Sequence, residues 1–189
     1  IYYLESGNSS MANKAIKMAI EQYPKNTSIL LLKVEALIFE NNIEEAEKII
    51  DSLYEIDRNN SEIIIQKSRI LSKRKKHSKS INLLKKISKD CEFYSDALVM
   101  IGKEYLFIDN FENAKEKFKE YIKNHQLDYA VLNNLLYCFD ALGNTDNTIN
   151  YLNDFLEENP YCEVAWHQLG KQYLKKELFK EALTAFDFA

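Results

Sequence analysis

Residues 159–189 read NPYCEVAWHQLGKQYLKKELFKEALTAFDFA and contain the single tryptophan of this 189-residue chain. Trp166 and Tyr173 are seven positions apart, which places both on one face of a helix with 3.6 residues per turn. Ala182 and Phe186 are four positions apart and share a face of a second helix. The stretch therefore predicts two amphipathic helices joined by a short turn.

The same pattern returns every 34 residues along the whole chain. Three columns of this period, which end at Trp166, Tyr173 and Phe186, hold large apolar residues, and a fourth column holds small residues at every step. That fourth column consists of Ala12, Ala46, Ser80, Ala114, Thr148 and Ala182. Pro24 and Pro160 lie four periods apart, so no insertion or deletion interrupts the register.

This period, with W-x2-L-G-x2-Y, A-x3-F and a closing proline, resembles the tetratricopeptide repeat (TPR), and the likeness is strongest to bacterial TPR proteins. The motif stands most completely in 163–189 and 95–128. It is looser in two other units, where Lys33 and Lys67 replace the expected leucine, and Val34 and Ser68 replace the glycine. The resemblance covers the entire chain.

The resemblance implies an all-α fold, a right-handed TPR superhelix of antiparallel helix hairpins with about five and a half 34-residue repeats. We expect a single solenoid over 1–189, and a fragment of a longer array, because neither end has a polar capping helix. Phe186 and Phe188 are expected to form the face for a following unit. The units are 1–26 (partial), 27–60, 61–94, 95–128, 129–162 and 163–189 (partial).

Helices are expected at 10–22, 27–40, 44–57, 61–74, 78–91, 95–108, 112–125, 129–142, 146–158, 163–176 and 180–189. The turns inside the hairpins fall at Gly7, Asn41, Lys75, Asp109, Gly143 and Glu177. Gly, Asn and Asp tolerate the left-handed conformation that ends a helix, which accounts for four of these six positions. Gly102 and Gly170 are expected where paired helices cross closely.

Composition narrows the functional classes. A net charge of −4 disfavours a nucleic-acid partner, which normally requires a basic surface. No apolar run reaches the length of a membrane span, so we expect no membrane partner. Three cysteines without CxxC spacing indicate reduced thiols and a cytoplasmic protein. The chain begins without a methionine, so the sequence does not tell whether a signal peptide precedes Ile1.

No catalytic motif is present, and we predict neither enzyme activity, nor a cofactor, nor a metal site. His77, His125 and His167 fall in three different columns of the repeat, and the sequence contains no Gly-rich phosphate loop. The run SKRKKHSK, residues 72–79, is the most concentrated charge feature. It fits an anionic docking patch or a solvated hairpin turn, and the solvated turn is favoured.

In proteins that this chain resembles, the first helix of each unit lines a concave binding face. Two columns project there: Leu31, Ile65, Val99, Asn133 and His167, and one turn further Glu35, Arg69, Lys103, Tyr137 and Lys171. The candidate peptide-binding residues are Arg69, Val99, Lys103, Asn133, Asn134, Tyr137, His167 and Lys171. The face is apolar in its N-terminal half and polar to basic in its C-terminal half, which suits a peptide with an acidic segment. Solvated or packing positions are the alternative.

Some TPR co-chaperones hold acidic chaperone C-termini in a carboxylate clamp of Lys, Asn and Arg on these columns. Asn134 matches the middle Asn of that clamp. Val99, Val164 and Gln168 stand where the clamp needs Lys or Arg, so the clamp is absent.

We therefore predict a non-enzymatic scaffold that binds a partner protein or peptide on its concave face. One alternative is a structural solenoid that self-associates through its uncapped ends. A second is a regulatory TPR appendage of a larger enzyme or DNA-binding protein. RNA binding is disfavoured by the net charge of −4. The sequence does not identify the partner.

Overall fold

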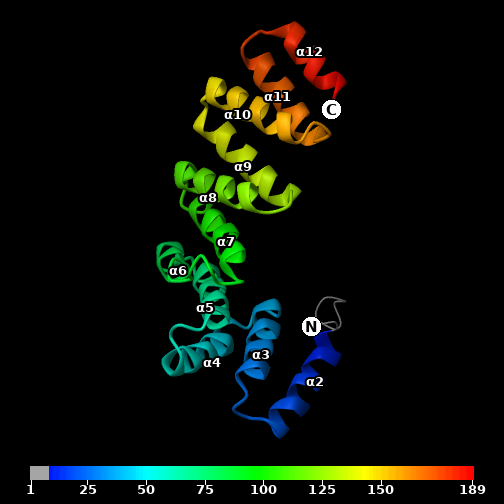
Figure 1. The fold of residues 1–189 in the computed structure, drawn as a ribbon. Coiled ribbons are helices and arrows are strands. Elements are labelled where there is room, and N and C mark those ends of the chain that lie inside the picture. Colours follow the sequence, from blue (N-terminus) through cyan, green and yellow to red (C-terminus); the bar gives the residue numbers. More distant parts are fainter. Residues whose placement is uncertain (1–8) are drawn as a thin grey trace. The chain divides into compact units, whose positions relative to one another are not determined.

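The computed structural model describes residues 9–189, and this range consists of eleven helices without a strand (Figure 1). The all-α prediction is confirmed. The helices are α2 (Ser9–Gln22), α3 (Thr27–Phe39), α4 (Ile43–Ile56), α5 (Ser61–Lys73), α6 (His77–Leu84), α7 (Tyr94–Leu106), α8 (Phe111–Asn124), α9 (Tyr129–Leu142), α10 (Thr145–Glu158), α11 (Glu163–Lys175) and α12 (Phe179–Asp187).

The helices pack as antiparallel neighbours, most clearly in the hairpins α3–α4, α5–α6 and α11–α12 (Figure 1). The chain divides into two compact units, with the division between Asp109 and Asn110. Unit 1 contains α2 to α7, and unit 2 contains α8 to α12. That the whole chain forms a single TPR array, with the repeat bounds given above, stays a prediction.

The hairpin turns lie where the period places them. Asn41, Lys75, Asp109 and Glu177 have φ between 55° and 61°, and Gly143 has φ 67°. Five turn positions are thus confirmed, and Gly7 lies outside the described residues. In three turns the next N–H donates to a carbonyl five residues back and caps the preceding helix: Asn42 to Leu37, Lys76 to Leu71 and Leu178 to Tyr173.

One helix is much shorter than expected. The prediction of a helix over 78–91 is wrong beyond Leu84, where α6 ends. The N–H groups of Lys86 and Ile87 donate to carbonyls three residues back, and Asp90 N–H donates to the Ser88 hydroxyl. A serine side chain that bonds a nearby backbone N–H offers an alternative to the helical hydrogen bond, and the chain turns here before α7 begins.

The small column of the repeat is buried at the five positions whose side chains the structure describes. Ala46, Ser80, Ala114, Thr148 and Ala182 are each at most 1% exposed. Because a larger side chain at such a position would force neighbouring elements apart, the period fixes the approach of the helices as well as their boundaries.

Large apolar side chains fill the interior of each unit. Unit 1 has one cluster around Val34 and Ile50, on α3 and α4, and a second around Ile64 and Leu84, on α5 and α6. Unit 2 has a cluster on α9 to α12 that includes Leu152. Each fully buried side chain of this size contributes about 1.5–3 kcal/mol.

Gly170 is required by the close approach of α11 and α12. A Cβ at this position would lie 2.6 Å from the ring of Phe186. The crossing that the sequence predicts at Gly170 is confirmed. Phe186 is therefore a packing residue of its own hairpin. That it also forms a face for a following unit stays a prediction.

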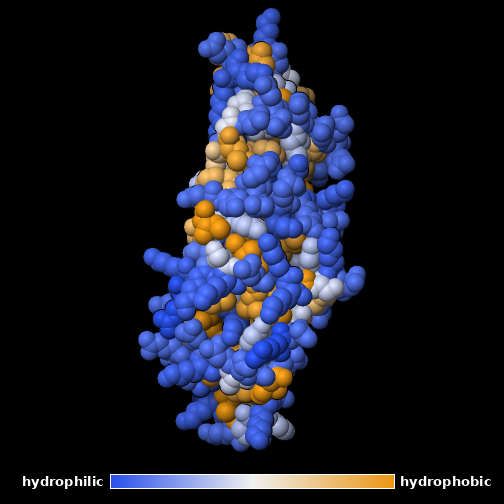
Figure 2. Space-filling view, turned by 90° about the vertical axis from the view of Figure 1, so that its left-hand side faces the viewer, coloured by the Kyte–Doolittle hydropathy of each residue, from blue (hydrophilic) through white to orange (hydrophobic). Residues whose placement is uncertain are grey.

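Phe188 is 61% exposed and stacks on Trp166, with 4.9 Å between the ring centroids. Two other large apolar residues of α12 are more exposed: Phe179 at 67% and Leu183 at 64%. Figure 2 shows separate orange, hydrophobic patches among mainly hydrophilic side chains on the face in view. None of the helices that the structure describes is long and apolar enough to cross a membrane.

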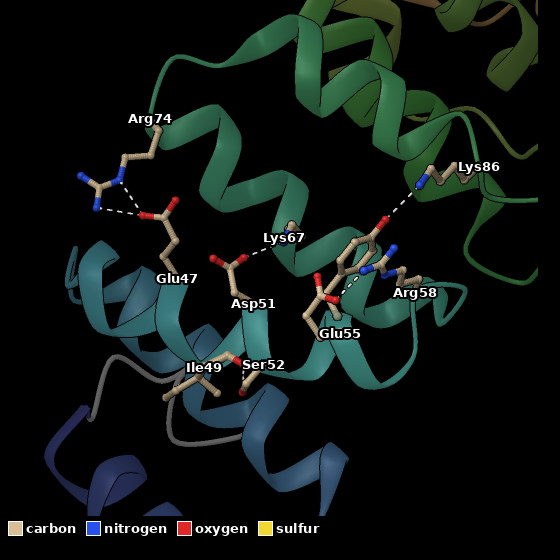
Figure 3. A network of polar contacts seen from close by, with 10 residues as sticks. Glu47, Ile49, Asp51, Ser52, Glu55, Arg58, Lys67, Arg74 and Lys86 are labelled. Carbon is tan, nitrogen blue, oxygen red and sulfur yellow. Dashed lines mark hydrogen bonds and ion pairs between the residues drawn. The ribbon is translucent and has the colours of Figure 1, made fainter.

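Ion pairs join α4 to α3 and α5 and explain two departures from the TPR pattern. Lys33 pairs with Glu45 at 2.6 Å. Lys67 pairs with Asp51, also at 2.6 Å (Figure 3). Lys67 Nζ also lies 4.4 Å from the centroid of the Tyr54 ring. The two lysines thus stand at an apolar column of the repeat because α4 offers each of them a carboxylate.

Candidate functional site

The two columns predicted to line the binding face come together in unit 1. Leu31 on α3 and Ile65 on α5 are each 6% exposed, and both line a pocket of about 340 Å³. One turn further along each helix, Arg69 Nη1 lies 3.3 Å from Glu35 Oε1, and both residues line the same pocket. The 34-residue period therefore brings residues of equivalent position side by side.

This pocket, here called the α3–α5 pocket, has an apolar floor and a mainly acidic border. Its floor and wall include Leu31, Leu32, Ile65 and Phe93. Three carboxylates and one guanidinium complete the charged lining: Glu35, Glu62, Asp96 and Arg69. A second hollow adjoins it, since it shares Glu62 and Phe93, and it adds the carboxylate of Glu92.

Two of these carboxylates lie at the starts of helices. Glu62 lies in the first turn of α5 and Asp96 in the first turn of α7, where the helix dipole favours negative charge. The side chain of Asn60 caps α5 by accepting the Ile63 N–H at 3.2 Å. Among the described residues neither Glu62 nor Asp96 has a hydrogen-bond or ion-pair partner, so both carboxylates are free to meet a ligand.

Arg69 is the pocket's one basic side chain in the part of the chain that the structure describes, and it is already engaged. Its guanidinium donates to Glu35 and, at 3.5 Å, to Gln66 Oε1. The side chains of Arg69 and Glu35 are 45% and 40% exposed, so this pair contributes little to stability. The two other candidates of unit 1 lie on α7, Val99 half-buried and Lys103 exposed, and neither lines this pocket.

The candidate residues of unit 2 lie on α9 and α11 and are mostly exposed. Asn133, Tyr137, His167 and Lys171 are exposed, and Asn134 is half-buried. The Tyr137 ring meets Phe111 edge-on at 5.9 Å, and the His167 ring lies 5.6 Å from Phe186. Within the described residues these five candidates share no hydrogen bond with one another.

A polar cluster on α9 and α11, here called the Asp140 cluster, was missed by the sequence analysis. Asp140 accepts hydrogen bonds from Gln168, Gln172 and Lys175, each at 2.8 Å. Gln168 and Gln172 are 5% and 2% exposed. The signal that could have revealed the cluster is the series Gln168, Gln172 and Lys175 along one helix, about one repeat after an aspartate.

The Asp140 cluster also shifts the titration of its carboxyl group. Burial acts to raise the pKa of Asp140, but hydrogen bonds from Lys175, Gln168 and Gln172 and the charge of Lys175 together lower that pKa below its ordinary value. The ionised carboxylate is therefore favoured by the fold. Gln168, which stands where a carboxylate clamp would need arginine, is committed to this internal contact.

The basic run at 72–79 agrees in its lysines, but not in His77, with the predicted solvated turn. Lys73, Lys75, Lys76 and Lys79 are exposed, as expected of a solvated turn. His77 differs from them: its Nδ1 lies 2.7 Å from Oε2 of Glu104, which is 3% exposed. His77 therefore satisfies a buried carboxylate.

Among the described residues, the cysteines form no disulfide bond and the metal-ligating side chains form no metal site. Cys138 and Cys162 are buried and Cys91 is half-buried, all as free thiols. Burial raises the pKa of the Cys138 thiol to about 11, which keeps it protonated at neutral pH. Across residues 9–189 no three His, Cys, Asp or Glu side chains gather as they would around a metal ion.

Residues 3–64 match the family model described as Tetratricopeptide repeat, and no curated protein matches the chain. Among solved structures, MamA is 19% identical with a TM-score of 0.65, over 82% of this chain and 91% of that one. YrrB, described as a TPR protein with an unusual peptide-binding site, is 17% identical with a TM-score of 0.65, over 92% and 90%. A tetratricopeptide repeat protein from Parabacteroides merdae is 16% identical with a TM-score of 0.64, over 97% and 73%.

At these identities the structural likeness shows the fold. Residues 3–64 match the tetratricopeptide repeat model, and the described helices share the fold of solved proteins of that class. Proteins of this class generally act by binding other proteins. The particular partner of this chain is the subject of the proposals below.

Proposed function

We propose that this protein is a non-enzymatic scaffold that binds an extended peptide segment of a partner protein along the face formed by the first helices of its repeats. The observation that carries the proposal is the α3–α5 pocket, whose floor is formed by Leu31 and Ile65 at equivalent positions of two repeats. A concave site with an apolar floor and a few polar groups at its border is the usual form of a ligand site.

The structural analogy supports the same role. YrrB is described as having an unusual peptide-binding site, and its fold is similar to this one. Because a fold can host several functions, this analogy adds to the pocket and does not replace it. Free cysteines fit a reducing compartment, and we place the scaffold in the cytoplasm.

We propose that the peptide contacts all eight candidate residues in their respective units. Six of them, Arg69, Lys103, Asn133, Tyr137, His167 and Lys171, are exposed and so are available to a ligand. Val99 and Asn134 are half-buried and would contribute the sides of the contact surface. The basic members would favour an acidic stretch of the peptide where it passes over α7 and α11.

A displayed library of random peptides, selected against the purified protein, tests the proposed function. Selected peptides are then measured against the double variant Lys103→Glu with Lys171→Glu. We expect at least a tenfold loss of affinity, because both lysines are exposed candidates on first helices. The matched control is Lys48→Glu with Lys180→Glu, the same charge change at exposed positions of the second helices α4 and α12.

The control variant should bind the selected peptides as the unmodified protein does. Failure to select any peptide, or equal losses in both double variants, would contradict the proposed function. Circular dichroism of all three proteins, with unchanged helix content and melting temperature, ensures that the comparison reports binding.

A further inference from the structure

We infer that the α3–α5 pocket selects a peptide segment in which an apolar side chain is followed or preceded, within two positions, by lysine or arginine. The inference rests on the proposed function and specifies the ligand class for unit 1. It adds a charge preference to the sequence-based expectation for this half of the face, which was an apolar surface.

The charge balance of the two adjoining hollows carries the inference. They are lined by four carboxylates, those of Glu35, Glu62, Glu92 and Asp96, against the single guanidinium of Arg69. The guanidinium is already held by Glu35 and Gln66. Among the described residues the carboxylates of Glu62 and Asp96 are consequently uncompensated, and they attract a cationic side chain and repel an anionic one.

The apolar floor supplies the second half of the recognition. Leu31 and Ile65 are almost fully buried but reach the pocket surface, and Leu32 and Phe93 stand beside them. An apolar side chain that covers this floor gains about 25 cal/mol for each Å² of apolar surface removed from water. Since Glu62 and Phe93 are common to both hollows, a bound segment meets floor and carboxylates within a short length of chain.

Acidic residues in the first turn of a helix are common, because they stabilise the helix dipole. One observation separates Glu62 and Asp96 from this general case. Both line the same apolar pocket although they belong to different helices.

Two fluorescein-labelled peptides of equal length test the inference by fluorescence anisotropy. One alternates leucine with lysine and the other alternates leucine with glutamate. We expect the full chain to bind the lysine peptide at least tenfold more tightly at low salt, and the difference to shrink as salt screens the charges. Equal binding, or tighter binding of the glutamate peptide, would overturn the inference.

Charge reversal locates the preference. The variant Glu62→Lys with Asp96→Lys should reverse the order of the two peptides, and Glu62→Gln with Asp96→Asn should abolish the difference. The matched control is Glu44→Lys with Glu181→Lys, since both residues are exposed and also lie in first turns, of α4 and α12. If the pocket variants and the control change the preference equally, the inference is wrong.

Failure of the inference can be distinguished from failure of the proposed function. If selected library peptides bind the protein but carry no lysine or arginine beside an apolar residue, the inference fails and the peptide-binding role stands. If neither the library nor the two designed peptides bind, both fail together.

Discussion

The α3–α5 face of unit 1 and the α9–α11 face of unit 2 are formed by equivalent helices of the repeat, yet their polar side chains are used differently. On the first face, Arg69 and Glu35 form one exposed ion pair at the border of an open pocket. On the second, Asp140 accepts three hydrogen bonds at 2.8 Å, two of them from buried glutamines.

This difference teaches that the repeat period determines where a side chain projects but leaves its task to its neighbours. Unit 2 uses its polar groups to join α9 to α11, whereas in unit 1 the carboxylates of Glu62 and Asp96 have no partner among the described residues. The first arrangement stabilises the fold and the second is available to a ligand. Mutations can separate these roles.

The largest expected effect is the loss of the Asp140 carboxylate. Asp140→Ala leaves the buried amides of Gln168 and Gln172 without their acceptor and should lower the free energy of unfolding by about 2 kcal/mol. Arg69→Ala removes an exposed ion pair and should change the free energy of unfolding by less than about 0.5 kcal/mol. Urea unfolding followed by circular dichroism measures both. Equal effects would remove the distinction between the two faces.

Replacement by alanine at one position of the repeat, Ser68 in unit 1 and Gly170 in unit 2, should change the stability in opposite directions. Gly170→Ala places a Cβ 2.6 Å from Phe186, and an overpacking cost of about 1–3 kcal/mol exceeds the helix-propensity gain of about 1 kcal/mol. Ser68→Ala removes a buried hydroxyl that has no partner in the described part of the chain, and should stabilise the protein by about 1 kcal/mol. Melting temperatures should move down and up, respectively, and a shared direction would contradict this account.

The pH dependence of stability should differ between the Asp140→Asn variant and the unmodified protein. Because the folded-state pKa of Asp140 is lowered, its stabilising contribution is complete above about pH 4 and is lost as the pH falls through the folded-state pKa. The melting-temperature difference between the two proteins should therefore be constant near neutral pH and shrink in acid. A difference that does not depend on pH would refute this role of the carboxylate.

The smallest expected effects are at the left-handed turn positions. Lys75 has φ 57° and Gly143 has φ 67°. Lys75→Gly should stabilise the protein by up to about 1 kcal/mol and Gly143→Ala should destabilise it by a similar amount, because side chains other than those of Asn and Asp are strained there. Asn41→Gly serves as the control with a smaller change. Thermal unfolding that shows no difference between these variants would refute the strain.

The fold could be predicted almost completely from the sequence, because the 34-residue period links helix starts, turns and small buried residues. Even Lys75 and Glu177, which have no intrinsic preference for the left-handed region, adopt it where the register requires. The prediction failed over 85–91, where the local bonds of Ser88 and its neighbours end α6 early. Such competition depends on single residues and leaves the period unchanged.

The candidate site was predicted less completely. The columns of Leu31 with Ile65 and of Glu35 with Arg69 follow from the period, and these residues line one pocket. Glu62 and Asp96 are also one period apart, so their meeting in the pocket follows from the register, whereas Phe93 reaches the pocket from the irregular segment that follows α6. The Asp140 cluster was missed because pairing across 28 to 35 residues depends on how α9 meets α11.

The central claim, that the α3–α5 face binds peptide, is tested most directly by methyl NMR of protein labelled at its leucine and isoleucine methyl groups, titrated with the lysine–leucine peptide. The account predicts saturable shifts for the methyl signals of Leu31, Leu32 and Ile65, with no shift for Ile56 or Leu183, which are exposed on α4 and α12. Saturable shifts at Ile56 or Leu183, with the three pocket residues unchanged, would contradict it.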